Sequence, residues 1–220
     1  MARIVALAAC ALCLVAPGCG GDDDDEADTP APPPERTAGQ ALWPPPDSAT
    51  DDPVRAARSF VEEYIGVEDP ALGPFAEKGA GAGEVDVHRR GEDGRQLAAV
   101  VSTLSLRQVE GDWLVESARS AEVEVATPAA GAEIASPTRI AGRGRGFEGN
   151  VVLEVREQYA VEPLAQKPVT AGSLERLEPF SARLAFDFGG AEAGAIVAKT
   201  GSGIAAADGF AAFPVRFRPG

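Results

Sequence analysis

Three closely spaced arginines are the residues of this chain best suited to recognise a charged ligand. Arg139, Arg143 and Arg145 lie within seven residues, and glycines flank two of them in the run GRGRG at 142–146. A guanidinium group can bind a carboxylate or a phosphate through two parallel hydrogen bonds. The run lies between two expected strands, so a loop that binds anions is one hypothesis for it. A flexible, solvated turn explains the same residues and is the interpretation that the sequence favours.

Side chains that could catalyse a reaction are scarce. His88 is the only histidine, so a catalytic triad or dyad has one candidate base, and its position beside Arg89 favours a surface residue. A single histidine cannot supply the three or four ligands of a zinc site. The run at 194–200 ends in Lys-Thr but has alanines where a phosphate-binding loop requires glycines.

We therefore expect no catalytic residue, no metal and no cofactor in this chain. A pair of carboxylates that hydrolyses a glycosidic bond is the enzymatic alternative. Such a pair is brought together by the fold, so the sequence alone leaves this possibility open.

The N-terminal segment carries the features of an export signal. Arg3 precedes an uncharged apolar run of about 13 residues, Ile4–Ala16, which is shorter than the ~20 residues that cross a membrane. Pro17, Gly18 and Cys19 follow. The segment 16–19 resembles the lipobox of bacterial lipoprotein signal peptides. The resemblance implies cleavage before Cys19 and acylation of that cysteine, which would anchor the chain outside the cytoplasmic membrane. An ordinary secreted protein that is cut nearby is the alternative.

Residues 19–52 predict a disordered spacer between this anchor and the folded chain. They contain seven prolines, and the segment 19–53 has ten acidic residues against one basic residue. Such a composition cannot bury enough apolar surface to fold. Trp43 either docks on the folded part or is exposed. The whole chain has a net charge of −14, which offers no basic excess for binding nucleic acid.

Residues 53–118 predict a small α+β domain that begins with one helix. Asp52 stands at the cap position and Pro53 at the first helical position, so we expect order to begin at Asp51. Apolar residues then recur at helical spacing as far as Ile65, and Gly66 ends the pattern. These signals predict a helix over 53–65.

An antiparallel meander should complete this small domain. Residues 67–83 are expected to be irregular, and strands are expected around 85–87, over 96–109 and over 113–116. The apolar face changes between Val101 and Leu104, which predicts a β-bulge. A unit of this size is marginally stable by itself, so we expect it to pack on the residues that follow.

Residues 122–218 show the alternation of an all-β domain. Seven short strands with turns between them predict an immunoglobulin-like sandwich with an aliphatic and phenylalanine core. Pro214 lies inside the last expected strand and places it at a sheet edge. The expected strands lie near 122–126, 138–142, 150–157, 168–171, 180–188, 194–200 and 211–218.

Several segments of this domain resemble the immunoglobulin-like domain of bacterial spore germination. The resemblance covers about 122–218 and implies an extracytoplasmic, non-catalytic sandwich, often found in envelope lipoproteins beside another small domain. The segments that carry it are Thr127-Pro128, Gly131-Ala132, Ile134-Ala135-Ser136-Pro137, Ile140-Ala141-Gly142, Phe147-Glu148-Gly149-Asn150-Val151, Pro179-Phe180, Lys199-Thr200 and Asp208-Gly209.

Taken together, the sequence predicts a mainly β, lipid-anchored protein of the bacterial cell envelope that is not an enzyme. Its expected role is to present a binding domain to an envelope protein or a wall polymer, in an envelope, sporulation or germination assembly. Two alternatives remain: an envelope hydrolase with a carboxylate pair, and a structural spacer subunit.

Overall fold

The computed structural model describes residues 41–91, 93–173, 175–201 and 209–218. Cys19, the predicted signal peptide and residues 19–40 of the predicted spacer lie outside this range. The described residues belong to one compact unit that spans Arg36–Gly220. None of their helices is both long enough and apolar enough to cross a membrane.

The first helix occupies the predicted residues 53–65. It consists of α1 (Pro53–Ser59) and a π-helical continuation, η3 (Phe60–Ile65). Asp52 caps its start, because its carboxylate accepts hydrogen bonds from the backbone N–H groups of Val54 and Arg55 at 2.9 and 3.1 Å. Gly66 ends the helix at a φ of 86°, a left-handed conformation that glycine adopts without strain.

Residues before the helix are ordered, so the prediction that order begins at Asp51 is wrong. Trp43 is only 4% exposed and forms a β-bridge with Val115. The Val115 N–H donates to the Trp43 carbonyl at 2.7 Å, and the Leu42 N–H donates to the Val115 carbonyl at 2.8 Å. The Trp43 indole N–H also donates to the Ser59 hydroxyl at 2.7 Å. The surrounding prolines led to a prediction of disorder, although the short apolar segment 41–43 is buried beside the helix. A short 3-10 helix, η2 (Pro46–Ser48), then leads towards α1.

The helix packs on a meander of antiparallel strands. The meander consists of β3 (Ala82–Arg90), β4 (Gln96–Val109) and β5 (Asp112–Arg119). The segment expected to be irregular contains two short strands, β1 (Ala71–Leu72) and β2 (Ala76–Gly79), which both pair with β3. The predicted bulge is confirmed: Val87 pairs with Ser102 and His88 with Val100, so the register skips Val101.

The remaining strands form the two sheets of a sandwich, as predicted. Strands β6, β8 and β11 make the three-stranded sheet, while β13, β12, β9 and β10 belong to the larger one. The short β7 was not predicted, and β11 ends at Leu184 rather than at residue 188. The bounds are β6 (Val123–Thr127), β7 (Glu133–Ile134), β8 (Thr138–Gly144), η4 (Phe147–Gly149), β9 (Asn150–Glu157), β10 (Pro163–Thr170), β11 (Glu178–Leu184), β12 (Ala193–Thr200) and β13 (Phe210–Phe217).

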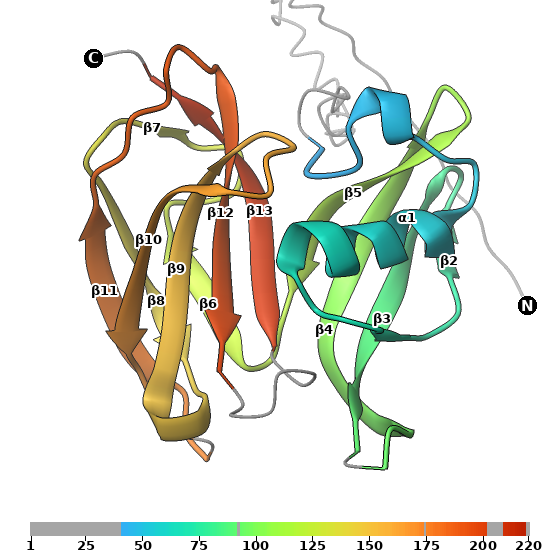
Figure 1. The fold of residues 1–220 in the computed structure, drawn as a ribbon, viewed down its shortest axis with the longest axis horizontal. Helices are drawn as coiled ribbons and strands as arrows, with labels where there is room; N and C mark the ends of the chain where they lie inside the picture. Colours follow the sequence, from blue (N-terminus) through green and yellow to red (C-terminus); the bar gives the residue numbers. More distant parts are fainter. Residues whose placement is uncertain (1–40, 92, 174, 202–208, 219–220) are drawn as a thin grey trace, which may run out of the picture. The chain divides into compact units, whose positions relative to one another are not determined.

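One continuous sheet joins the meander to the sandwich. Its order is β1-β3-β4-β5-β13-β12-β9-β10, and Ala118 of β5 pairs with Ala212 of β13 (Figure 1). The last strand is therefore internal, and the prediction that Pro214 marks a sheet edge is wrong. Pro214 is tolerated because its backbone points away from β12, where its carbonyl accepts a hydrogen bond from Gly131 at 2.7 Å.

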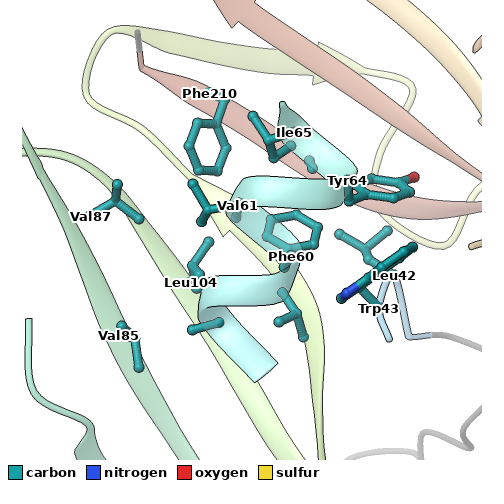
Figure 2. Packing of buried hydrophobic residues seen from close by; sticks show 14 of the residues in the cluster. Leu42, Trp43, Phe60, Val61, Tyr64, Ile65, Val85, Val87, Leu104 and Phe210 are labelled. Atoms are coloured by element: carbon teal, nitrogen blue, oxygen red, sulfur yellow. The ribbon is translucent and has the colours of Figure 1, made fainter. Parts of the chain in front are cut away.

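The helix covers the outer face of this sheet, so the two parts of the chain share a core. Phe60 packs against Tyr64 and against Phe210 of β13, with ring centroids 5.2 and 6.3 Å apart. Ala195 and Val197 of β12 belong to the same buried cluster. Figure 2 shows the side chains of the helix between Phe210, the strands of the meander and the Leu42-Trp43 segment. The expectation that the small α+β part leans on the sandwich is confirmed.

A second cluster lies between the two sheets of the sandwich. Ile196 and Ala198 of β12 point into it, alternating with the residues of β12 that face the helix. Phe180, Phe186 and Phe217 fill it, with Phe186 and Phe217 rings 5.4 Å apart. Both faces of β12 are therefore buried, one by the helix and one by the three-stranded sheet.

Candidate functional site

The sandwich has one covered face and one open face, and charged residues occupy both. On the covered face, Glu154 and Arg156 of β9 are only 2% and 3% exposed. The Arg156 guanidinium donates to the Glu154 carboxylate at 2.8 and 2.5 Å, and the Lys199 ammonium lies 2.6 Å from the other carboxylate oxygen. Each charge in this group therefore has a close partner, which buried charges require.

Arg156 also ties β9 to the end of the helix. Its guanidinium donates to the backbone carbonyl of Tyr64 and lies 4.7 Å from the centre of the Tyr64 ring. A cation at this position stabilises the free carbonyls of a helix C-terminus. Burial raises the pKa of the Tyr64 hydroxyl above its ordinary range, so the phenol stays neutral. The whole group is a structural contact between helix and sheet.

The open face is the outer surface of the three-stranded sheet, and two of the predicted arginines lie on it. Arg139 and Arg143 belong to β8 rather than to a loop, and both are exposed. The Arg139 Nε donates to the Ser181 hydroxyl at 3.0 Å, and an Nη of Arg143 donates to the Leu177 carbonyl at 3.1 Å. The strand fixes the Cα positions of both arginines, and each guanidinium group donates only one of these hydrogen bonds, so other N–H groups remain for solvent or a ligand.

Arg145 does not join the other two. Its Nε donates to the Glu122 carboxylate at 2.7 Å, and that carboxylate also lies 3.6 Å from an Nη of Arg89. Arg145 is half-buried and its charge is compensated inside the protein. The structure therefore separates the three predicted residues into two exposed arginines and one that pairs with Glu122.

A further arginine, which the sequence reasoning missed, completes the open face. Arg183 of β11 is exposed and stands directly opposite Arg139 in the antiparallel register of β8 and β11. Within the described part of the chain, neither Arg139 nor Arg183 forms an ion pair. The alternation in 180–188 predicts that Arg183 lies on the other face of its strand from the phenylalanines. Its pairing with Arg139 depends on the register between β8 and β11, which the sequence alone does not predict.

The other candidate for chemistry, His88, stands apart from this face. It is half-buried on β3, beside β1, and its Nδ1 atom is buried without a hydrogen-bond partner among the described residues. The expected surface histidine is thus more enclosed than predicted. The described residues also contain no cluster of three or more His, Cys, Asp or Glu side chains that could hold a metal ion.

Two cavities in the described region contain no pair of acids from different strands. A cavity of about 330 Å³ is lined by Val100–Thr103 of β4 and by 119–121, without a carboxylate. Another, of about 220 Å³, contains Glu110, in the turn after β4, and Asp112, the first residue of β5. Neither arrangement provides the two opposed carboxylates of a glycoside hydrolase.

Comparison with known proteins agrees with this architecture. Residues 122–204 match the family model described as the immunoglobulin-like domain of bacterial spore germination. No curated protein and no solved structure matches the chain significantly. The matched range includes β6, β8 and β9, and thus both the buried charge group on the covered face and the arginines of the open face. Residues 122–204 thus combine a match to the immunoglobulin-like domain of bacterial spore germination with the two-sheet sandwich that such a domain requires.

Proposed function

We propose that this chain is a lipid-anchored, non-enzymatic protein of the cell envelope that presents its immunoglobulin-like domain to a partner. The anchor would be Cys19, and the acidic, proline-rich spacer would hold the folded unit away from the membrane surface. The binding surface would be the outer face of β6, β8 and β11. The family of the domain and the signal-like sequence before Cys19 support this proposal.

The observation that carries the proposal is the asymmetry of the sandwich. The helix and the Leu42-Trp43 segment bury the outer face of β12 and β13. The three-stranded sheet has no such cover in the described part of the chain, and Figure 1 shows it on the side of the sandwich away from α1. A partner that recognises this domain through a sheet face would therefore use β6, β8 and β11.

A binding role also fits the side chains better than hydrolysis does. The open face carries arginines, which can bind an anion without catalysing a reaction, and the two cavities described above lack opposed carboxylates. A structural spacer remains the alternative against which the experiments below are designed. A spacer would make no specific contact through the open face.

The anchor is tested by replacing its cysteine. In the native host, the wild-type protein should fractionate with membranes, and Cys19→Ala should abolish acylation and release the protein from the membrane fraction. Mass spectrometry of the mature N-terminus provides an independent measurement. An unaltered membrane fraction for the variant, or a free thiol at position 19 in the wild type, would overturn the assignment.

The binding face is tested by crosslinking in intact cells. All cysteines besides Cys19 precede it in the sequence, so an introduced cysteine supplies a unique free thiol in the acylated, mature protein. Ser181→Cys places this thiol on the open face, and Glu62→Cys places it on the exposed side of the helix as a matched control. We expect specific crosslinked products from position 181 and not from position 62. The same products from both positions, or none from either, would favour the spacer.

A further inference from the structure

The most unusual pairing on the open face is that of two like charges. Arg139 and Arg183 are Cα partners in neighbouring strands, so their Cβ atoms lie about 5 Å apart. Like charges placed directly opposite each other destabilise a sheet, and here no described carboxylate compensates either one. A local cost of this kind is most often retained at a functional site. An anion bound between the two guanidinium groups would remove the repulsion.

The geometry of the pair favours a tetrahedral anion. The two oxygens of a carboxylate lie in one plane, so a single guanidinium fork can bind both of them. A phosphate diester carries two anionic oxygens on a tetrahedral phosphorus, so each of two neighbouring guanidinium groups can donate to one of them. The Arg139 Nε is already bound to Ser181, which orients the fork and leaves its Nη groups for a ligand.

The position of Arg143 extends the site along the strand. Arg143 lies four residues from Arg139 on the same face of β8, which corresponds to about 13 Å. Between them the outer face carries small side chains, Ala141 on β8 and Ser181 on β11. Glu124 of β6 is the Cα partner of Arg143 and the one acidic residue that the described strand registers place on this face, so positive charge remains in excess there. Charges at this spacing suit a chain with repeated anionic groups better than a single ion.

We propose that the open face binds an anionic polymer whose repeating groups are phosphate diesters. One phosphate would lie between Arg139 and Arg183, and a later one would reach Arg143. This inference rests on the proposed function, because it names the class of partner that the open face would meet in the envelope. Since exposed arginines form the site, binding should weaken as salt concentration rises.

The test measures binding of the mature protein, kept in detergent, to two synthetic polymers of matched charge and length. Poly(glycerol phosphate) supplies phosphate diesters and poly(glutamate) supplies carboxylates. We expect the wild type to bind the phosphate polymer, and the double variant R139Q/R183Q to bind it at least tenfold more weakly, ~1.4 kcal/mol. The matched variant R58Q/R95Q removes two exposed arginines elsewhere and should stay within about twofold of wild type.

Three results would overturn the inference. They are no binding of the phosphate polymer, equally tight binding of poly(glutamate), and an equal loss of affinity in the two double variants. Each differs from a failure of the proposed function, which would appear in cells as a protein that is not anchored or does not crosslink through position 181. Thermal unfolding of R139Q/R183Q serves as the folding control, because removal of the like-charge contact should leave the protein at least as stable as wild type.

Discussion

The two faces of the immunoglobulin-like domain use arginine in opposite ways. On the covered face, Arg156 is 3% exposed and is held by Glu154 and by the carbonyl of Tyr64. On the open face, Arg139 and Arg183 are exposed and have no described carboxylate partner. The comparison teaches that a buried arginine requires compensation, whereas an exposed arginine can lack a carboxylate partner and keep its N–H groups available to a ligand.

The largest expected effect comes from breaking the buried group. Glu154→Gln leaves Arg156 and Lys199 without their shared carboxylate, so we expect the free energy of unfolding to fall by about 3–5 kcal/mol. Urea unfolding measures this loss. Glu157→Gln removes an exposed acid at the end of the same strand and should change stability by less than about 0.5 kcal/mol. Similar values for the two variants would show that the buried group does not hold the covered face.

Removing part of the cover should have the next largest effect. Trp43→Ala deletes a buried indole that packs against Tyr64 with ring centroids 5.5 Å apart, so we expect a loss of about 3 kcal/mol. Equilibrium unfolding again provides the measurement. Asp47→Ala, in the exposed 3-10 helix of the same segment, is the control that should leave stability nearly unchanged. If Trp43→Ala behaved like this control, the segment 41–43 would not contribute to the fold.

The ion pair between Arg119 and Glu84 is intermediate between the buried, compensated arginine and the exposed, unpaired arginines. Arg119 donates to Glu84 at 2.8 Å, and this hydrogen bond, opposed by desolvation and assisted by Lys78, holds the pKa of Glu84 below its ordinary value. The contribution to stability is therefore present above the unfolded pKa of about 4.3 and is lost as the pH falls through the lowered folded value. Because the pair is near the surface, we expect less than about 1 kcal/mol.

Glu84→Gln isolates this contribution. The difference in unfolding free energy between wild type and variant should be largest near neutral pH and should shrink towards zero in acid, below the folded pKa of Glu84. Urea midpoints measured for both proteins across the acid range give the result directly. A difference that grew in acid would contradict the sign of the pKa shift.

The smallest expected effect concerns the open face. Arg183→Gln removes a like-charge contact, so stability should stay the same or rise by up to about 0.5 kcal/mol. Arg183→Glu should stabilise the sheet further, because it creates an opposite-charge pair with Arg139. Thermal unfolding measures both variants, and both should lose affinity for the phosphate polymer. A clear loss of stability in Arg183→Gln would mean that this arginine supports the fold rather than a ligand.

Local patterns in the sequence predicted the elements well. The helix 53–65 depends on Asp52, Pro53 and Gly66, which act on their own backbone, and the bulge at Val101 follows from a phase change visible in one strand. Alternation likewise predicted β9 and most of the sandwich strands. These features need no knowledge of which distant residues come together.

Long-range pairing was the part that the sequence did not reveal. Pro214 lacks an N–H group, and this alone predicts an edge strand. The sequence does not show that the backbone of this position points away from β12, which makes proline acceptable inside the sheet. Glu154 and Arg156 alternate with apolar residues as a solvent face would, yet a helix from nearly a hundred residues earlier covers them. Arg183 became part of the candidate site only through its register with Arg139.

The continuous sheet has a consequence for how such proteins can be divided. A fragment starting at residue 122 would turn Val197, Phe210 and Ala212 towards water and would leave Arg156 without the Tyr64 carbonyl. The first residue of the family match is thus not a point at which the polypeptide can be cut without loss. Any exchange of this sandwich between genes would have to carry its helix along, or supply another apolar lid for β12 and β13.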